Sequence, residues 1–254
     1  MFDARLPLVG TQKIAAPTYV LTAEAGHVFG PLVRRIIREQ AVRSVCDFGG
    51  GANPVLSLEE VAQMGLRYLV IDASEAELRK TPSGYETRQL DLADPGFELM
   101  DAPFDLVVSR FVAEHVADPA AFHTHARGVL RPGGHAAHFF PTLPSPPFVA
   151  NRLLTSCASR RLIDLLQADS RNREGRAGKF QAYYRWCVGP TRRQYRRFAS
   201  VGFVVEEYVV HVGHHYYLRI PRIQRMSDSL SRLLIRRPWP GLATYAAVVL
   251  RRSP

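Results

Sequence analysis

The chain has 254 residues, 46% of them hydrophobic, which is enough for one large α/β domain or two small ones. No run of about 18 uncharged apolar residues occurs, and the opening MFDARLPLVGTQK lacks the basic start and apolar core of a secretory signal. Cys46, Cys157 and Cys187 do not have the spacing of a metal site, so we expect reduced thiols in a cytoplasmic protein.

The net charge of +10 is distributed unevenly along the chain. Residues 1–150 contain 13 basic and 17 acidic side chains, whereas residues 151–254 contain 20 and 6. Arginine supplies 30 of the 33 basic residues. Such an excess is explained either by a GC-rich coding sequence or by an anionic substrate, nucleic acid or lipid surface near the basic part.

Periodic apolar residues predict alternating helices and strands. Residues 17–40 are predicted to form a helical lead-in, because Leu32, Val33, Ile36 and Ile37 have the spacing of one helix face. The alternation that follows favours a mostly parallel sheet with helices on both faces. The predicted strands cover 44–48, 67–72, 85–92, 104–109 and 135–140, and the predicted helices lie near 54–64, 74–80 and 118–130.

Capping and turn residues mark the ends of these helices. Asn53 is a suitable N-cap with Pro54 at the first helical position, and Gly65 suits the position just past the helix end. Asp118 followed by proline repeats the start signal, and the Arg-Pro-Gly-Gly sequence at 131–134 is expected to close that helix.

The pattern changes after Phe140. Four prolines in PTLPSPPF exclude regular structure there, and an arginine-rich segment, partly helical and partly loose, continues to residue 189. Regular signals return as a helix near 190–200, a strand near 203–211 and a last strand at 242–251. We expect a single domain over 1–254, made of a lead-in (1–42), a core (43–140), an inserted lid segment (141–189), and a terminal helix and strands (190–254) with an insertion at 212–240.

Three glycines follow the first core strand in SVCDFGGGANP. A glycine turn between a strand and a helix lets a ligand approach the backbone, although a purely structural tight turn would have the same composition. Asp72 ends the next strand, where a carboxylate can accept hydrogen bonds from both hydroxyls of a ribose. Ser74 can cap the following helix, which leaves Asp72 available for a ligand.

Five segments in order resemble the class I S-adenosylmethionine-dependent methyltransferases, in their small-molecule branch. These are VCDFGGGANP, LVIDAS, RQLDLAD, FDLVVSRFVAEHV and LRPGGHAAHF, within residues 42–140. The resemblance implies a Rossmann-like, doubly wound seven-stranded sheet, mostly parallel with an antiparallel terminal strand. It also implies S-adenosylmethionine as cofactor and methyl transfer as the reaction.

The resemblance also implies which residues meet the cofactor. Asp47 and the turn Gly49–Gly51 would meet its methionine part, and Asp72 would hold its ribose. Asp91 would accept the adenine amino group, with Leu92 as an apolar wall. The remaining residues implied at the cofactor are Asn53, Ala73, Ser109, Arg110 and Phe111, the last three near the sulfonium. Asn53 stands where many relatives have a last glycine, and Gly50 stands where cysteine or serine is frequent.

A proton acceptor for the methyl acceptor is expected to be a histidine. His115 is the first choice, because the strand before it ends beside the methyl donor, and His138 is the second. No set of metal ligands is expected, because the sequence lacks a convincing group of aspartates and His211, His214 and His215 do not have ligand spacing.

The insertions suggest a pocket for a bulky, partly apolar acceptor that carries negative charge. Phe140, Tyr183, Tyr184 and His214 are its predicted contacts, although these aromatic side chains could equally bury one another. The favoured acceptor is an oxygen, nitrogen or carbon of a small or carrier-linked metabolite, such as a secondary metabolite, sugar or lipid precursor.

Two other functions remain open. An RNA-modifying methyltransferase could use the basic C-terminal part to bind phosphates, although the base-clamping Asn/Asp-Pro-Pro-aromatic motif is absent from SRFVAEHV. A protein of this fold could also bind the cofactor without transferring a methyl group. The sequence RIQRMSDSLSRLL has helical spacing of apolar residues, typical of a helix packed on its own domain or lying on an anionic membrane. The sequence does not determine the oligomeric state.

Overall fold

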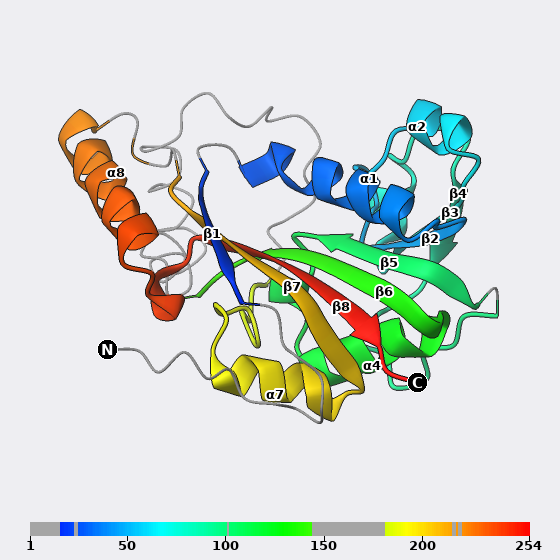
Figure 1. Ribbon diagram of the computed structural model, residues 1–254. Coiled ribbons are helices and arrows are strands. Elements are labelled where there is room, and N and C mark those ends of the chain that lie inside the picture. The colour runs from blue at the N-terminus through cyan, green and yellow to red at the C-terminus, as the bar shows by residue number, and fades with distance from the viewer. Residues whose placement is uncertain (1–15, 23–24, 101, 144–180, 215–216, 218–219) are drawn as a thin grey trace.

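The computed structural model describes residues 16–22, 25–100, 102–143, 181–214, 217 and 220–254 (Figure 1). Its described helices are α1 (Phe29–Glu39), α2 (Leu58–Gln63), α3 (Glu75–Leu78), α4 (Pro119–Val129), α7 (Arg192–Ser200) and α8 (Pro221–Arg236), with short 3₁₀ turns η1 (Ala25–His27), η2 (Ala113–His115) and η3 (Pro240–Leu242). The strands are β1 (Thr18–Leu21), β2 (Ser44–Phe48), β3 (Arg67–Asp72), β4 (Glu86–Gln89), β5 (Phe104–Arg110), β6 (Leu130–Pro141), β7 (Phe203–Val212) and β8 (Tyr245–Arg252).

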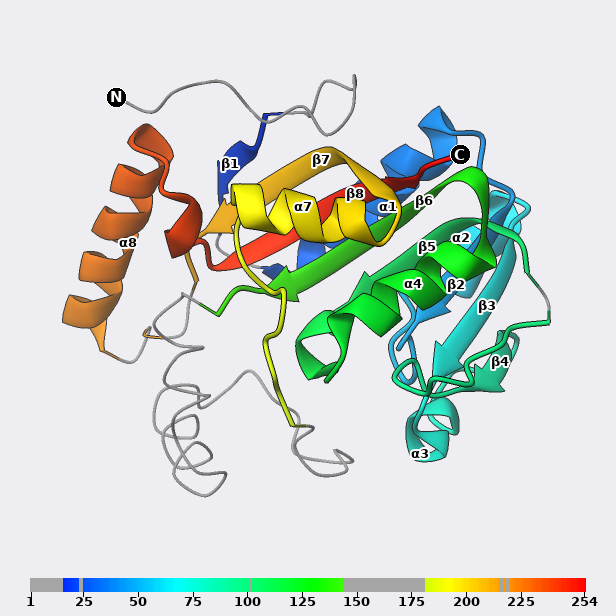
Figure 2. The same cartoon turned by 90° about the horizontal axis from the view of Figure 1, so that it is seen from below.

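The eight strands form one sheet in the order β1-β7-β8-β6-β5-β2-β3-β4. All neighbouring pairs are parallel except those of β8, which runs antiparallel to both β6 and β7. Helix α1 covers one face of the sheet, and α4 and α7 cover the other (Figures 1 and 2). The predicted mostly parallel, doubly wound sheet with an antiparallel terminal strand is therefore confirmed.

The sheet has one strand more than predicted. Residues 18–21, expected to be helical, form β1 and pair in parallel with β7. The sequence Thr-Tyr-Val-Leu is rich in β-branched and aromatic residues, which favour an extended chain. An exposed edge of β7 offers unpaired backbone groups to such a segment, and this tertiary pairing overrides the helical pattern that begins further along.

The helix boundaries were predicted with mixed success. Helix α4 begins after Asp118, whose carboxylate accepts hydrogen bonds from two backbone N–H groups, as expected. Gly65 has a φ of +60° just beyond α2, also as expected. The prediction that Asn53 caps α2 is wrong. The helix starts after Ser57, because Ser57 and Glu60 form a capping box that satisfies two backbone donors.

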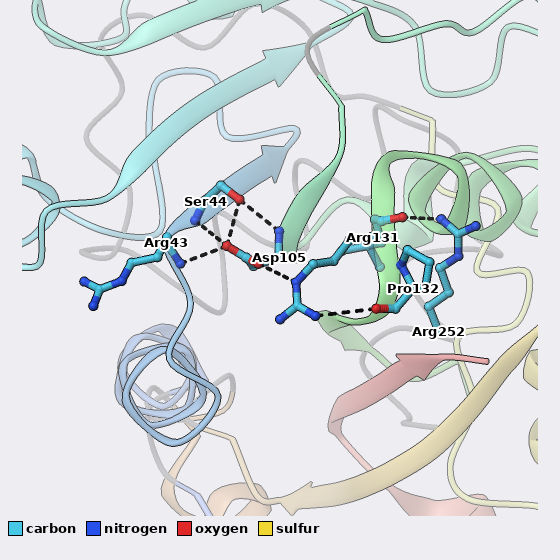
Figure 3. A network of polar contacts seen from close by, with 7 residues as sticks. Arg43, Ser44, Asp105, Arg131, Pro132 and Arg252 are labelled. Atoms are coloured by element: carbon cyan, nitrogen blue, oxygen red, sulfur yellow. Dashed lines mark hydrogen bonds and ion pairs between the residues drawn. The ribbon is translucent and has the colours of Figure 1, made fainter. Parts of the chain in front are cut away.

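A polar network holds the amino ends of β2 and β5 together (Figure 3). The carboxylate of Asp105 accepts hydrogen bonds from the backbone N–H groups of Arg43 and Ser44, from the Ser44 hydroxyl, and at 2.5 Å from Arg131 Nε. Burial acts to raise the pKa of Asp105, but the hydrogen bonds from Arg131 and Arg43 outweigh it and hold that pKa below its ordinary value. This network therefore lies at the amino ends of the parallel strands, on the side of the sheet away from their carboxyl ends.

Candidate active site

The parallel strands bring the predicted cofactor residues together at the carboxyl ends of the strands. In the register of β2 with its neighbours, Phe48 lies opposite Ile71 of β3 and Ser109 of β5. The segments that follow these strands therefore start side by side. The glycine turn follows β2, Ala73 follows Asp72 at the end of β3, and η2 comes soon after Arg110 at the end of β5.

Each glycine of the turn lies against a neighbouring side chain. Gly49 has a φ of +69°, and a Cβ there would lie 2.4 Å from Val112 Cγ2. Gly51 has a φ of +34°, and a Cβ there would lie 2.6 Å from Asp72 Oδ2. A side chain at either position would collide and would strain the backbone. The close approach of Gly51 places the turn directly beside the carboxylate predicted to hold the ribose.

Asp47 is buried beneath the turn and is only partly hydrogen-bonded. Its Oδ2 accepts hydrogen bonds from the Tyr68 hydroxyl at 2.6 Å and from the Val55 N–H at 2.8 Å. Its Oδ1 is also buried and has no partner in the described part of the chain. Burial raises the pKa of Asp47 to about 6, against the opposing effect of the two hydrogen bonds. An unpartnered buried carboxylate oxygen fits a cationic donor such as the ammonium of a methionine group.

Asp72 is half-buried at the end of β3. Its Oδ1 accepts a hydrogen bond from the Ser74 N–H at 2.8 Å, and the Ser74 hydroxyl caps α3 by accepting from the Glu77 N–H. The prediction that Ser74 caps this helix is therefore confirmed, but Asp72 is not left wholly free, because one of its oxygens accepts the Ser74 N–H. Burial and the nearby Glu77 raise the pKa of Asp72, whereas the Ser74 N–H acts in the opposite direction. The neighbouring Ala73 carbonyl accepts from Gln89 Nε2.

Arg110 ties the end of β5 to the loop after the glycines. Its NH2 donates to the Asn53 carbonyl oxygen at 3.0 Å. Phe111 follows with a φ of +60°, and its ring lies edge-on to Phe139. Asn53 thus stays close to the turn through its backbone, although it caps no helix.

Asp91 and Leu92 follow β4, the strand that pairs with β3. The Asp91 carboxylate is exposed, and its Oδ1 accepts a hydrogen bond from the Ala93 N–H at 2.8 Å. The Leu92 side chain is buried, and its carbonyl accepts from His125 Nδ1 of α4 at 3.0 Å. Leu92 is therefore fixed in place as an apolar side chain, as an adenine wall requires.

Glu114 and His115 form η2 directly after β5. His115 Nδ1 lies 3.0 Å from the Gln181 carbonyl oxygen, and its Nε2 lies 3.9 Å from Glu114 Oε1. The Glu114 side chain is buried, its Oε2 has no partner among the described residues, and burial raises its pKa to about 8. The Glu114 carbonyl accepts N–H hydrogen bonds from Tyr183 and Tyr184, which fixes the 181–187 segment over η2.

His138 is in register with Ser109 near the carboxyl ends of the strands, but its side chain is buried in the core. Its ring is fully buried on β6, with Nδ1 2.8 Å from the Ser109 hydroxyl, and packs against Phe122 and His123. Burial lowers the pKa of His138 to about 3, so the ring is neutral and a weak base. The burial of its ring argues against His138 as a general base, and the Ser109 hydroxyl contacts that ring within the core.

Three of the four predicted substrate contacts are buried. Phe140 lies within β6, and Tyr184 packs beside η2 with a φ of +52°. His214 contacts the Ser227 hydroxyl and the Tyr217 ring under α8. Tyr183 is partly exposed. Most of the predicted lid segment, residues 144–180, lies outside the described residues, as do Cys157 and His215.

The sequence did not predict two residues of the candidate active site. Tyr68 holds Asp47 from the neighbouring strand, and its signal was a hydroxyl within the apolar run RYLVID. Glu114 is a buried carboxyl next to the favoured histidine, but nothing in the sequence shows that its side chain points inward. No group of three His, Cys, Asp or Glu side chains in the described part of the chain could hold a metal ion. Within the same residues no helix is long and apolar enough to cross a bilayer.

Comparison with known proteins points to one family. Residues 46–138 match the family model described as a methyltransferase domain. A ubiquinone biosynthesis O-methyltransferase from Caulobacter vibrioides is 31% identical over 129 residues, which are 42% of this chain and 50% of that protein. The protein of the same name from Parvibaculum lavamentivorans is 33% identical over 123 residues, which are 46% and 47% of the two chains. The chain spans about half the length of the curated relatives it matches.

Solved structures share the fold at low sequence identity. An S-adenosylmethionine-dependent methyltransferase from Clostridium acetobutylicum has a TM-score of 0.52 at 8% identity, covering 89% of this chain and 91% of that one. A SAM-dependent methyltransferase from Archaeoglobus fulgidus has a TM-score of 0.50 at 14% identity, covering 88% and 94%. Residues 46–138 thus match a methyltransferase domain, and the described residues share the fold of solved S-adenosylmethionine-dependent methyltransferases.

Proposed function

We propose that this protein transfers a methyl group from S-adenosylmethionine to a hydroxyl oxygen of a small or carrier-linked acceptor. The observation that carries the proposal is the glycine turn between two acidic side chains, with the unpartnered Asp47 Oδ1 on one side and the Asp72 carboxylate on the other. The choice of oxygen is supported by relatives named as O-methyltransferases.

In this proposal the chain's own residues hold and orient the cofactor. Asp47 would accept the ammonium group, Asp72 the ribose hydroxyls, and Asp91 and Leu92 would border the adenine. The bound cofactor supplies an electrophilic methyl group on a sulfonium. The protein then has two further tasks, which are to align the acceptor and to remove its proton.

His115 is the proposed proton acceptor. Its Nδ1 faces a carbonyl oxygen, which can only accept, so Nδ1 carries the hydrogen and Nε2 is the basic nitrogen. Nε2 also faces Glu114 Oε1 at 3.9 Å. Burial raises the pKa of Glu114 to about 8, so this carboxyl is largely protonated at neutral pH, and an imidazolium formed at His115 would favour its ionised form. Glu114 would act as a positioning residue through His115.

Methyl transfer can be measured with S-adenosylmethionine labelled in the methyl group and a panel of phenols and catechols. We expect label in the organic product, and we expect His115→Gln to lower kcat by about 10²-fold or more with little change in cofactor KM. His135→Gln is the control, because that histidine lies in the amino half of β6 and pairs with Glu206 of β7. A parent protein that binds the cofactor but transfers label to none of the phenols and catechols would overturn the proposal in favour of binding without transfer.

RNA methylation is less well supported, because several arginines are engaged within the chain. Arg251 pairs with Glu206 at 2.6 Å, Arg35 pairs with Glu207 at 2.5 Å, and Arg252 donates to the Leu130 carbonyl. Turnover of a small molecule that is insensitive to salt supports the first proposal, whereas RNA binding that weakens steeply with salt supports this alternative.

A further inference from the structure

Helix α8 packs on the protein through a mixed polar and apolar side and leaves four large apolar side chains exposed. The side chains that face the protein most closely are Gln224, Ser231 and Leu234. A helix that packs on its own domain normally buries apolar residues and exposes polar ones. Four outward side chains depart from that rule: Ile223 is 42% exposed, Met226 73%, Leu230 44% and Leu233 51%.

Hydrogen bonds fix this orientation of α8. Gln224 Nε2 donates to the His214 carbonyl at 2.9 Å and to Asp228 Oδ1 at 2.7 Å. The Ser227 hydroxyl contacts His214 Nε2 at 3.3 Å, and the Ser231 hydroxyl donates to the Ser227 carbonyl. Rotating the helix to bury Leu230 and Leu233 would break the two contacts with His214, which lies outside the helix, and would leave buried polar atoms unsatisfied. The apolar face is therefore held outward by the fold.

Positive charge flanks the apolar face. Five arginines on or just after α8 are exposed, and its one acidic side chain, Asp228, bonds to Gln224. None of the five forms an ion pair within the described residues. Trp239 follows the helix and is 62% exposed. The five arginines are Arg222, Arg225, Arg232, Arg236 and Arg237.

The position of α8 places this face at the same end of the sheet as the candidate active site. Strand β7 leads into α8, and β6 and β7 both point toward it, so α8 stands beyond the carboxyl ends of these strands (Figures 1 and 2). The helix packs on β1, where Val20 and Leu21 are also exposed.

We propose that α8 docks this protein on an anionic lipid bilayer, with the leucine face in the interfacial region and the arginines at the headgroups. An interfacial helix combines an apolar face, flanking cations and a tryptophan in this way. A second copy of the chain is a poorer occupant, because a two-fold interface would bring the two sets of arginines together. The proposal extends beyond methyl transfer and does not depend on it.

Vesicle sedimentation tests this directly with the full chain. Vesicles of phosphatidylcholine are compared with vesicles that also contain phosphatidylglycerol, at low and high salt. We expect binding to the anionic vesicles, and we expect it to fall by about tenfold for each of Leu230→Ser and Leu233→Ser, since each replaces partly exposed apolar surface. Arg225→Gln with Arg232→Gln should abolish the preference for the anionic lipid.

Matched controls separate lipid docking from general stickiness and from dimerisation. Met226→Ser should weaken binding, whereas Met100→Ser, at a similarly exposed methionine away from α8, should not. All these side chains are exposed, so unchanged thermal unfolding verifies the fold of each variant. Equal effects of the two methionine variants would overturn the proposal. So would failure of the parent to bind anionic vesicles, including the case in which sedimentation equilibrium shows a dimer that Leu233→Ser dissociates.

Discussion

Asp72→Asn isolates the part of the carboxylate that a ribose would use. In the parent protein, Asp72 Oδ1 is engaged by the Ser74 N–H at 2.8 Å, and Oδ2 lies on the side of Gly51. Asparagine keeps one oxygen for the Ser74 N–H and therefore preserves the start of α3. It replaces the second oxygen by an amide group, which cannot accept a hydrogen bond from a hydroxyl.

The loss of affinity follows from the number and kind of bonds removed. A hydrogen bond to a charged group contributes about 1.5–3 kcal/mol. Asp72 is half-buried, so the lower end of that range applies to each of two ribose hydroxyls. The expected loss is about 3 kcal/mol, which corresponds to roughly a 100-fold increase in the Kd for S-adenosylmethionine.

Isothermal titration calorimetry with S-adenosylmethionine and S-adenosylhomocysteine measures this change. Asp94→Asn is the matched control, because Asp94 Oδ1 accepts an N–H from the residue two positions on, as Asp72 does, but lies on an exposed loop. We expect the control to bind like the parent. Both variants should unfold within about 1 kcal/mol of the parent, because each keeps its local backbone hydrogen bond.

An unchanged Kd in a folded Asp72→Asn variant would refute the assignment of this carboxylate to the ribose. If the parent itself binds neither ligand, the glycine turn serves only the packing against Val112 and Asp72. Equal weakening by Asp94→Asn would show that the effect reflects charge or stability rather than contact.

Three further predictions concern the turn, the acidic residue beside His115 and the opposite edge of the sheet. Gly51→Ala should reduce cofactor affinity about tenfold or more in the same titration, because its Cβ would lie 2.6 Å from Asp72 Oδ2. Backbone strain at a φ of +34° should also lower the free energy of unfolding of this variant by about 1–2 kcal/mol. Glu114→Gln should gain stability relative to the parent as pH rises from about 4.5 to about 8. The pKa of Glu114 is raised to about 8 in the folded parent, so the stability of the parent falls over that window. A stability difference that stayed constant in thermal unfolding across this pH range would contradict the prediction. Asp105→Asn should lower the free energy of unfolding by about 1–3 kcal/mol near neutral pH. This difference from the parent should shrink as pH falls through the depressed pKa of Asp105. Urea titrations at several pH values measure it.

The strands and the site edge could be predicted because their signals are local. Buried parallel strands read as continuous apolar runs, and Asp47 and Asp72 follow from the turn chemistry at the ends of two such runs. The start of α4 was equally local, since Asp118 caps the helix that Pro119 begins. Each of these features depends on neighbours within a few residues.

The remaining features depend on contacts between distant parts of the chain. β1 exists because β7 offers it an edge, and His138 is buried because α4 lies over it. On α8 the apolar spacing predicted a helix correctly, but periodicity alone cannot say which face turns inward. The inward face is chosen by Gln224 and by the His214 carbonyl, which the chain brings together only when folded.

The place of β8 in the sheet has a consequence for how the protein is made. Within the described residues, β1 and β7 are joined to the rest of the sheet only through β8, which follows both of them in the chain. On the ribosome, therefore, β7 emerges with no partner strand on its inner side until Tyr245–Arg252 has been synthesised. The β2–β6 half can assemble earlier from contacts close in sequence, and the other half closes in a single late step. During that interval β7 presents an open, apolar edge, so nascent chains stalled before β8 should be the species that chaperones bind.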